Sequence, residues 1–419
     1  MQNFIITGGK RLSGEIELQG CKNSTLPIMA AAILVNGKCN LESCPNLTDV
    51  YSAARILNYL GCKCSIVGNR GEIDASAMTG SEIPERLMRE MRSSIMFMGA
   101  ILGRMGECTF SNPGGCELGP RPIDMHLAAL TKMGAEIHDY NGRICCRMPK
   151  GRARGARLSL SFPSVGATEN IILCAVLAEG ETVINNAARE PEICDMCRFL
   201  RSCGAKIKGD GESCIAVEGV EKLHGCEYRI MPDRIAGATY LSMTAAAGGE
   251  LILKNACVEE MEPFISVLEQ TGCFICVADD RIYLRRGGRL KAIKNRIRTM
   301  PHPGFPTDAQ AVLMAALATA EGTSVFEENI FDCRYRHTDA LIKMGADIQV
   351  MGKAAVIRGV KRLHGADVEA TDLRGGAAMA VAALAAEGTT RIGSISHIDR
   401  GYEKFEDVIT SLGGSICRE

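Results

Sequence analysis

The chain has no tryptophan, and only 5% of its 419 residues are aromatic. Its 48 Lys and Arg residues nearly balance its 49 Asp and Glu residues. A nucleic-acid surface needs a clustered excess of positive charge, often with aromatic side chains for base stacking. The balanced charge therefore argues against a nucleic-acid-binding protein, although 8 Tyr and 11 Phe residues remain available for stacking.

Long apolar runs are also missing. The longest, such as residues 26–35, fall well short of the ~18 apolar residues that a membrane-spanning helix needs. Residues 1–14 lack the apolar core of a signal peptide. No Walker loop and no Gly-x-Gly-x-x-Gly motif occur, so nothing supports nucleotide hydrolysis or dinucleotide redox chemistry. We expect a cytoplasmic protein without a cofactor.

Cysteine, by contrast, is abundant, with 20 residues. Disulfide frameworks belong to short secreted chains, so we expect reduced thiols in a chain of this length. Two Cys-x-x-Cys pairs occur, Cys194 with Cys197 and Cys273 with Cys276. Their surroundings predict a helix and a strand, respectively, instead of the tight turns of zinc knuckles. We therefore expect no metal site at these pairs.

A Leu-x-x-x-Gly motif recurs through the whole chain at intervals of about 70 residues. Apolar residues at helical spacing precede each glycine and alternating ones follow it, which predicts a helix, a left-handed glycine cap and a strand. The glycines are Gly61, Gly134, Gly204, Gly272, Gly345 and, in an altered copy, Gly413. Six such α/β units, grouped three and three, fit the two domains expected from the length. The alanine-rich segments 309–320 and 377–386 predict helices buried inside each domain, with sheets outside.

Gly and Pro surround one cysteine, Cys116, in the segment 113–122. These residues forbid regular structure, and Arg121 can activate a nearby thiol or bind an anion beside it. Most cysteines act as small apolar side chains, and that role is the alternative for Cys116. The loop nevertheless predicts Cys116 as the reactive thiol.

Charged residues also stand at the ends of predicted elements. Lys22 lies between an alternating strand and a helix that is expected to start near Leu26, where backbone N–H groups attract phosphate or carboxylate. For Lys22 alone, a solvated side chain is the commoner role, and Asp308 alone predicts a helix cap. Similar residues are Arg92, Arg334, Asp372, Arg374 and Arg400. Together they suggest a cleft between domains that binds a multiply charged small molecule.

Seven motifs, in order, resemble those of the UDP-N-acetylglucosamine 1-carboxyvinyltransferases, the enolpyruvyl transferases that begin peptidoglycan synthesis. They are Lys22-Asn23, Arg92 in Met-Arg-Ser-Ser-Ile, Gly-Gly-Cys116-Glu-Leu-Gly-Pro-Arg121-Pro122, Ser164-Val165-Gly166-Ala-Thr, Phe-Pro-Thr-Asp308, Asp372-Leu-Arg374 and His-Ile-Asp-Arg400-Gly-Tyr402-Glu403. The resemblance covers essentially the whole chain. Several motifs in the right order are far more specific than any one of them.

The resemblance implies an α/β fold of two inside-out α/β barrel domains, each of three repeats of about 70 residues with buried helices and outer sheets. One domain would comprise residues 1–21 with 230–419, and the other, which carries the Cys116 loop, residues 22–229. The implied reaction transfers the enolpyruvyl group of phosphoenolpyruvate to the 3′-hydroxyl of UDP-N-acetylglucosamine and releases phosphate. No metal is implied.

The resemblance also implies residue roles. Cys116 would be the general acid, able to form a covalent adduct, and Asp308 the general base, because the enol carbon becomes electrophilic only after its methylene is protonated. Lys22, Arg92, Arg121 and Arg400 would surround phosphoenolpyruvate, while Arg334, Asp372 and Arg374 would organise the closed site. The sugar nucleotide would contact Asn23, Arg121, Pro122, Ile123, Asp124, His126, Ser164, Val165, Gly166, Asp308 and Ile330. The Cys116 loop would act as a lid.

Two alternatives stay open. The shikimate-pathway enolpyruvyl transferases share the fold and chemistry but lack the Gly-Gly-Cys lid motif. A regulatory paralogue that binds UDP-N-acetylglucosamine without turnover would keep the binding residues. The chain departs from relatives at Cys333 and Tyr335, which replace Asn and Phe, and at Phe162, which replaces a lysine. These departures put in doubt how strongly the substrates bind at these positions, more than whether the chain is active. Separately, the thiol of Cys116 predicts sensitivity to the epoxide fosfomycin.

Overall fold

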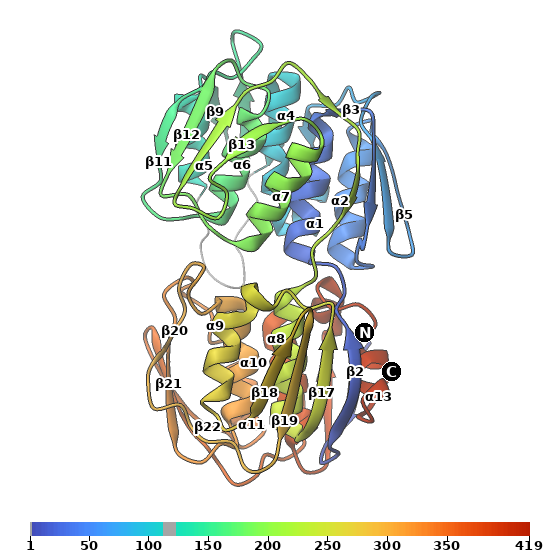
Figure 1. Ribbon diagram of the computed structural model, residues 1–419, viewed down its shortest axis with the longest axis vertical. Coiled ribbons are helices and arrows are strands. Elements are labelled where there is room, and N and C mark those ends of the chain that lie inside the picture. Colours follow the sequence, from blue (N-terminus) through green and yellow to red (C-terminus); the bar gives the residue numbers. More distant parts are fainter. Residues whose placement is uncertain (1, 112–122) are drawn as a thin grey trace. The chain divides into compact units, whose positions relative to one another are not determined.

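The computed structural model describes residues 2–111 and 123–419, which form two compact units (Figure 1). Unit 1 comprises residues 2–19 and 232–419, and unit 2 comprises residues 20–111 and 123–231. Within these described ranges, every helix is too short or too polar to cross a membrane.

Unit 2 contains three four-stranded sheets and one two-stranded sheet among its described residues. Its helices are α1 (Lys22–Ala31), η1 (Ala32–Leu34), α2 (Thr48–Tyr59), α3 (Glu85–Glu90), η2 (Arg92–Met96), α4 (Phe97–Met105), α5 (Asp124–Lys132), α6 (Val165–Ala175) and α7 (Pro191–Ser202). The four-stranded sheets have the orders β16 (Glu227–Arg229), β4 (Lys38–Glu42), β6 (Arg70–Asp74), β5 (Lys63–Val67); β7 (Glu82–Ile83), β8 (Glu107–Ser111), β10 (Arg143–Arg147), β9 (Glu136–Tyr140); and β11 (Arg157–Ser159), β12 (Glu181–Asn185), β14 (Cys214–Glu218), β13 (Lys206–Lys208). The fourth sheet pairs β15 (Leu223–His224) with β3 (Val35–Asn36).

Unit 1 contains three further four-stranded sheets among the residues that the structure describes. Its helices are α8 (Arg234–Ala247), α9 (Val258–Glu269), α10 (Thr307–Leu317), α11 (Thr338–Lys343), α12 (Leu373–Ala385), η3 (Ile395–Arg400) and α13 (Phe405–Ser411). The sheets have the orders β24 (Asp367–Glu369), β25 (Thr389–Gly393), β1 (Phe4–Thr7), β26 (Ser415–Arg418); β18 (Phe274–Ala278), β19 (Arg281–Arg286), β17 (Gly249–Lys254), β2 (Leu12–Glu17); and β20 (Ile297–Arg298), β21 (Thr323–Glu327), β23 (Ala354–Arg358), β22 (Asp347–Met351). These sheets are separate, and no closed barrel forms within the described ranges.

The alanine-rich helices are buried, as predicted. The helices α8, α10 and α12 pack against one another in unit 1, and residues 377–383 of α12 are all 0% exposed. Alanine lets helix backbones approach closely, while the strands show alternating burial, as in the pattern exposed, buried, half-buried, buried, exposed of β14. The helices therefore form the apolar centre and the sheets present one face to it.

The recurring Leu-x-x-x-Gly motif is a helix-ending structure. In the first copy the N–H of Cys62 donates to the carbonyl of Leu57, and the N–H of Gly61 donates to that of Asn58. This pair of bonds defines a Schellman motif, which needs a left-handed residue at the glycine position. All six motif glycines have φ between 84° and 101°. The predicted glycine caps are confirmed.

The first two strands of the chain complete sheets of unit 1. The strand β1 lies between β25 and β26 and pairs antiparallel with both, and β2 pairs parallel with β17. The N-terminal residues therefore belong to a unit whose other strands lie beyond residue 231. The chain leaves unit 1 after β2, builds unit 2 and then returns.

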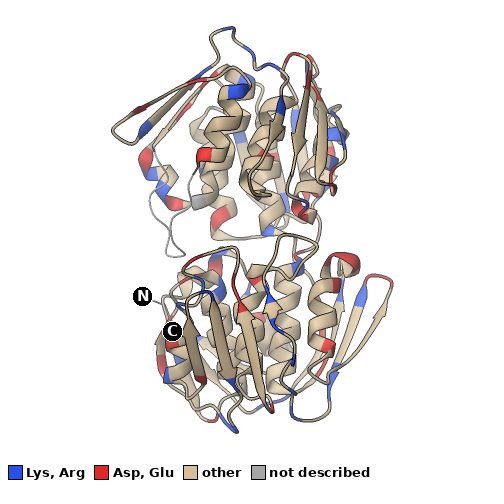
Figure 2. Ribbon diagram, turned by 90° about the vertical axis from the view of Figure 1, so that its left-hand side faces the viewer, with Lys and Arg blue, Asp and Glu red and all other residues tan. Residues whose placement is uncertain are grey.

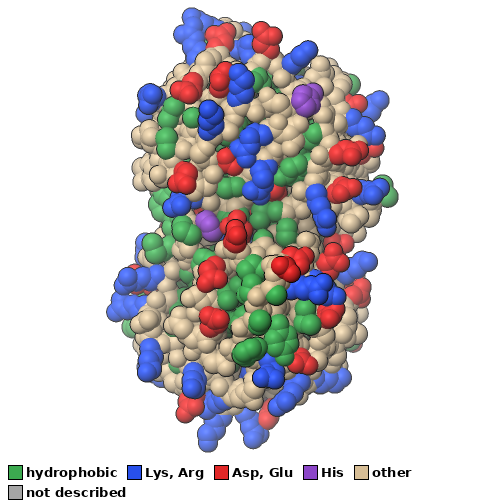
Figure 3. Space-filling model, in the orientation of Figure 1, with side chains coloured by type: hydrophobic (Ala, Val, Ile, Leu, Met, Phe, Trp, Pro, Cys, Tyr) green, Lys and Arg blue, Asp and Glu red, His purple; other side chains and the backbone are tan. Residues whose placement is uncertain are grey.

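Both units carry mixed surface charge. Figures 2 and 3 show Lys and Arg interspersed with Asp and Glu on each unit, in agreement with the balanced composition. Hydrophobic side chains gather over β18 and β19 in Figure 3, and Phe274 and Val277 of β18 are exposed. Any binding of a charged ligand must therefore depend on local clusters of charge.

Candidate active site

Asp308 lies in the first turn of α10, where two arginines bind its carboxylate. Arg334 Nη2 donates to Oδ1 at 2.7 Å, and Arg374 Nη2 donates to Oδ2 at 3.1 Å. The arginine side chains are 3% and 4% exposed, whereas that of Asp308 is 26% exposed. The carboxylate is thus held from inside the unit and remains accessible to a solute.

This arrangement differs from the helix cap that the local sequence predicts for Asp308. The N-cap residue of α10 is Pro306, and no side chain caps the helix there. Asp308 is a residue of the helix itself and binds the two guanidinium groups. The local pattern misleads because Arg334 and Arg374 are 26 and 66 residues away in the sequence.

Tyr402 supports Arg374 from its other side. Arg374 Nη1 donates to Tyr402 Oη at 3.1 Å, and Tyr402 Oη lies 2.8 Å from Thr239 Oγ1. Burial disfavours the charged guanidinium, but the charge of Asp308 and the contact with Tyr402 outweigh it and raise the pKa of Arg374. Burial also raises the pKa of Tyr402, so both groups stay protonated at neutral pH.

Asp372 fixes the backbone from which Arg374 projects. Its Oδ1 accepts hydrogen bonds from the N–H groups of Arg374 and Gly375, at 3.0 and 3.1 Å, and so caps α12. His337 is fully buried nearby, and its Nδ1 donates to the carbonyl of Arg334 at 3.2 Å. Burial lowers the pKa of His337 to about 4, so this imidazole is neutral at pH 7.

The loop that carries Ile330 is tied to the first turn of α10 by a buried carboxylate. Glu328 is 1% exposed, and its Oε1 accepts from the N–H groups of Ile330 and Phe331 at 2.9 and 3.1 Å. Thr307, next to Asp308, donates its hydroxyl to the same carboxylate at 3.0 and 3.1 Å. The half-buried Ile330 therefore belongs to the neighbourhood of Asp308.

Arg400 is the last residue of η3 and is half-buried. Tyr402 follows it closely in the chain and joins the Asp308 cluster through Arg374. No role could be predicted from the sequence for four residues of this neighbourhood, Tyr402, Thr239, His337 and Glu328. Their hydrogen bonds reveal them: Tyr402 joins Thr239 and Arg374, which are distant in the sequence, and Glu328 binds Thr307.

In unit 2, Lys22 is paired with an aspartate. Lys22 lies in the first turn of α1 and Asp49 in the first turn of α2, and Lys22 Nζ is 2.7 Å from Asp49 Oδ2. The two side chains are only 9% and 1% exposed. The half-buried Asn23 is the next residue of the helix. The ammonium group is thus positioned inside the unit instead of being solvated.

The helix begins earlier than the sequence predicts. Its first residue is Lys22, about one turn before the expected start near Leu26. Tertiary contacts hold this first turn: the N–H of Cys21 donates to the carbonyl of Met231 at 2.8 Å, and the Ser24 hydroxyl donates to the carboxylate of Asp195. These contacts with distant segments are invisible in the local pattern.

His126 and the start of α6 form a second buried cluster in unit 2. Asn170 Nδ2 donates to His126 Nδ1 at 2.9 Å and to the carbonyl of Gly166 at 3.3 Å. A Cβ atom at Gly166 would lie only 3.1 Å from His126 Cε1, so this position suits glycine. Burial lowers the pKa of His126 to about 4, and the imidazole is neutral at pH 7.

Ser164, Val165 and Gly166 form the N-terminal end of α6. Ser164 is the N-cap of α6, and its hydroxyl accepts from the N–H of Ala167 at 3.4 Å. The N-terminal N–H groups of a helix favour an anion. Nearby, Ile123 is half-buried and Asp124 is exposed at the start of α5.

The remaining predicted residues are less fully described. Cys116, Arg121 and Pro122 lie outside the described residues. Arg92 begins η2, and only its backbone is described. The described candidates therefore form one cluster around Asp308 in unit 1 and a set around Lys22 and His126 in unit 2.

Known proteins resemble this chain over its full length. A family model described as EPSP synthase (3-phosphoshikimate 1-carboxyvinyltransferase) matches residues 6–409. The UDP-N-acetylglucosamine 1-carboxyvinyltransferase 2 of Caldanaerobacter subterraneus subsp. tengcongensis is 51% identical over 419 residues, with 100% of both chains covered. The UDP-N-acetylglucosamine 1-carboxyvinyltransferase of Nitratidesulfovibrio vulgaris (strain Hildenborough) is 45% identical over 420 residues, again with 100% of both chains covered.

Solved structures agree on the fold. The enolpyruvyl transferase NikO from Streptomyces tendae has a TM-score of 0.88 at 24% identity and covers 100% of this chain and 98% of its own. EPSP synthase from Acinetobacter baumannii has a TM-score of 0.80 at 20% identity, with 100% of both chains covered. At these identities the likeness establishes the α/β fold alone. The family model and the two relatives at 51% and 45% identity show that this chain belongs to the EPSP synthase family of enolpyruvyl transferases.

Proposed function

We propose that the chain transfers the enolpyruvyl group of phosphoenolpyruvate to the 3′-hydroxyl of UDP-N-acetylglucosamine, with release of phosphate, as the first committed step of peptidoglycan synthesis. Relatives that bear the name of this activity are 44% to 51% identical over the whole chain. The observation that carries the proposal is the Asp308 cluster, because it supplies a fixed and accessible carboxylate of the kind that this reaction needs.

Asp308 is the proposed general base. A base at a sugar hydroxyl must be ionised, must accept a proton and must be reachable. Two guanidinium groups on the two carboxylate oxygens favour the ionised form, and the 26% exposure leaves room for a hydroxyl. Tyr402 and Asp372 act as positioning residues, since both hold Arg374 in place.

Cationic side chains are the proposed binding groups for phosphoenolpyruvate, which carries a phosphate and a carboxylate. Guanidinium groups bind such oxyanions in bidentate fashion, and a lysine adds a point charge. Lys22 is already directed by Asp49, and we propose that Arg92, Arg121 and Arg400 complete the set. Fixed cations of this kind stabilise the charge that develops on the departing phosphate.

Cys116 is the proposed general acid at the methylene carbon, and it can also form a covalent adduct. Fosfomycin is an epoxide that would alkylate this thiol. We expect Cys116→Asp to keep turnover, since a carboxylic acid can also donate a proton, and to resist the drug. Unmodified Cys116 and full activity after prolonged incubation of the wild type with fosfomycin and UDP-N-acetylglucosamine would contradict this role.

The start of α6 is the proposed site for the sugar nucleotide. The helix offers N–H groups beside Val165 and Gly166, which are both partly exposed. His126 is neutral and buried against the same turn, so it positions this turn without adding charge. Asn23, Ile123, Asp124 and Ile330 are proposed to complete the binding residues for this substrate.

We infer further that each unit is a domain of three repeats with sheets outside and helices inside, an inside-out α/β barrel, divided near residues 21 and 229. The three four-stranded sheets of each unit and its central helices support this interpretation. We also propose a cytoplasmic location. The 19 described cysteines are all free thiols, which suits a reducing compartment.

Phosphate release tests the proposal. The purified chain is incubated with phosphoenolpyruvate alone, with UDP-N-acetylglucosamine, or with shikimate 3-phosphate. We expect release only with the sugar nucleotide. Release with shikimate 3-phosphate alone would assign the chain to the other branch of the family, and binding of UDP-N-acetylglucosamine without release would favour a regulatory paralogue.

A further inference from the structure

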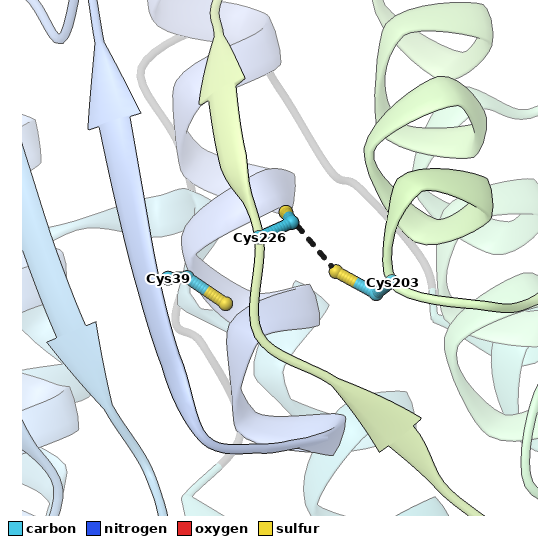
Figure 4. Close-up of side chains that lie close together, drawn as sticks. All are labelled: Cys39, Cys203 and Cys226. Atoms are coloured by element: carbon cyan, nitrogen blue, oxygen red, sulfur yellow. Dashed lines mark hydrogen bonds between the residues drawn. The ribbon is translucent and has the colours of Figure 1, made fainter.

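Three cysteines from separate segments meet inside unit 2 (Figure 4). Cys39 lies in β4, Cys203 is the C-cap of α7, and Cys226 directly precedes β16. Their sulfur atoms all lie within 4.8 Å of one another, and the Sγ atoms of Cys203 and Cys226 are 3.3 Å apart. Cys39 and Cys203 are 0% exposed, while Cys226 is partly exposed. Among the described residues, no other group of three possible ligands meets this criterion.

Backbone hydrogen bonds fix the three segments relative to one another. The N–H of Asn40, next to Cys39, donates to the carbonyl of Cys226 at 2.9 Å, where β16 begins to pair with β4. The N–H of His224 donates to the carbonyl of Cys203 at 2.9 Å. The thiols are therefore held together by the sheet and by the end of α7, and binding a ligand would not require the fold to rearrange.

We propose that Cys39, Cys203 and Cys226 form a binding site for one thiophilic metal ion, Zn²⁺. Thiolate sulfur is the ligand that Zn²⁺ favours in buried sites, with Zn–S bonds of about 2.3 Å. Three sulfurs around one ion then lie roughly 4 Å apart, which the present cluster allows with small side-chain shifts. Binding replaces three S–H protons by three Zn–S bonds and releases the three protons. A water molecule on the side of the partly exposed Cys226 is the proposed fourth ligand.

The site is independent of the proposed reaction. Cys39, Cys203 and Cys226 belong to none of the motifs that carry the family resemblance, and no Cys-x-x-Cys spacing joins them. The ion would link β4, the end of α7 and the start of β16. Its expected effect is therefore on the stability of unit 2.

Zinc titration of the full chain, under a phosphine reductant that does not bind the metal, tests the proposal. A chromophoric chelator competes for the ion and reports the affinity. We expect one tightly bound equivalent of Zn²⁺, the release of about three protons and a rise in Tm of about 5 °C or more at free zinc about 100-fold above Kd. Cd²⁺ should bind at the same stoichiometry and give thiolate charge-transfer absorption in the ultraviolet.

A matched pair of triple variants locates the site. Cys39→Ala/Cys203→Ala/Cys226→Ala removes the cluster and should no longer bind one equivalent of Zn²⁺ tightly. Cys108→Ala/Cys146→Ala/Cys174→Ala removes three other buried thiols of unit 2, whose sulfur atoms do not all lie within 4.8 Å of one another, and should keep the tightly bound Zn²⁺. If the first variant fails to fold, Cys226→Ser replaces the partly exposed thiol alone and should also lose tight binding.

Three results would overturn the proposal. The first is the absence of a tight equivalent in the reduced wild type. The second is equal zinc uptake by the wild type and by the cluster variants. The third is a Cys203–Cys226 disulfide, found by peptide mapping of chain isolated without exposure to air, that accounts for these thiols and excludes the metal.

Discussion

The Asp308 cluster of unit 1 and the Lys22 pair of unit 2 hold their central charges in opposite ways. Asp308 is a partly exposed anion held by two buried cations, with 26% of its side chain accessible. Lys22 is a nearly buried cation held by a buried anion, with exposures of 9% and 1%. In the first case the central charge is partly exposed and its partners are buried, and in the second both partners are buried.

This difference predicts that a substrate would contact the two charges in different ways. Asp308 can receive a hydroxyl without breaking either of its arginine contacts, because each guanidinium group binds one oxygen from inside. We expect an anionic substrate bound at Lys22 to share the ammonium group with Asp49. Changes at Asp308 should therefore affect the chemical step, and changes at Lys22 should affect the binding of phosphoenolpyruvate.

The largest effect is expected for Asp308→Asn. The amide keeps the shape and can accept a hydrogen bond from one of the two arginines, but its NH2 group cannot accept from the other and the side chain cannot take a proton. We expect kcat for phosphate release to fall by about 10²- to 10⁴-fold, with a smaller change in KM. Asp339→Asn, an exposed aspartate in the first turn of α11, is the control and should leave kcat unchanged. Wild-type kcat in Asp308→Asn would remove Asp308 from the chemistry.

Lys22→Met should mainly weaken the binding of phosphoenolpyruvate. Losing a buried charge partner typically costs 2 kcal/mol or more, so we expect kcat/KM for this substrate to fall about 30-fold or more. The control is Lys38→Met, which removes a lysine from an exposed ion pair with Glu72 in the same unit. It should change kcat/KM for phosphoenolpyruvate little. A drop in kcat alone, with KM unchanged, would contradict the proposed contrast between the two units.

The buried imidazole of His126 should make unit 2 sensitive to acid. Above about pH 6.5 the imidazole is neutral in the folded and the unfolded chain. Below that value the unfolded chain takes up a proton, while the folded chain resists until about pH 4, so stability falls as the pH falls between these values. The lowered pKa of His126 corresponds to a decrease of about 3 kcal/mol in the free energy of unfolding across this pH range.

Thermal unfolding of His126→Gln against pH checks this expectation. The variant should lose part of the decline in Tm between pH 6.5 and 4 that the wild type shows. His138→Gln, which replaces an exposed histidine of the same unit, should keep the full decline. Identical pH profiles for all three proteins would mean that His126 does not resist protonation in the folded chain.

The smallest effect is expected for Tyr402→Phe. The change leaves the guanidinium of Arg374 and the hydroxyl of Thr239 without this buried partner, which should lower the free energy of unfolding by about 1–3 kcal/mol. We expect kcat to fall by less than about tenfold, since Asp308 keeps its direct contacts. Tyr283→Phe removes an exposed hydrogen bond to Glu250 in the same unit and serves as the control. Equal stability of the two variants would show that Tyr402 is not a support of the cluster.

Local features of this fold could be predicted from the sequence. The Leu-x-x-x-Gly motif predicts a helix end because both hydrogen bonds of the cap lie within six residues, as those of Gly61 and Cys62 show. The alanine-rich helices could be predicted because their composition leaves no polar face. Both signals depend on residues that are close together in the sequence.

Distant contacts could not be predicted in this way. The local pattern predicts a later start for α1 because it contains no sign of Met231 and Asp195, which hold the first turn. It predicts a cap for Asp308 because the two arginine partners are 26 and 66 residues away. Family resemblance pointed to Asp308, Arg334 and Arg374 but not to Tyr402 or Glu328 as supports. Nothing in the sequence joins Cys39, Cys203 and Cys226, which meet only through the folding of β4, α7 and β16.

The most direct test of the account is the acceptor-dependent release of phosphate by the wild type and Asp308→Asn, measured side by side at saturating phosphoenolpyruvate and UDP-N-acetylglucosamine. We expect release by the wild type only when the sugar nucleotide is present, and a rate lower by about 10²-fold or more in the variant. Equal rates in the two proteins, or release that ignores the sugar nucleotide, would contradict it.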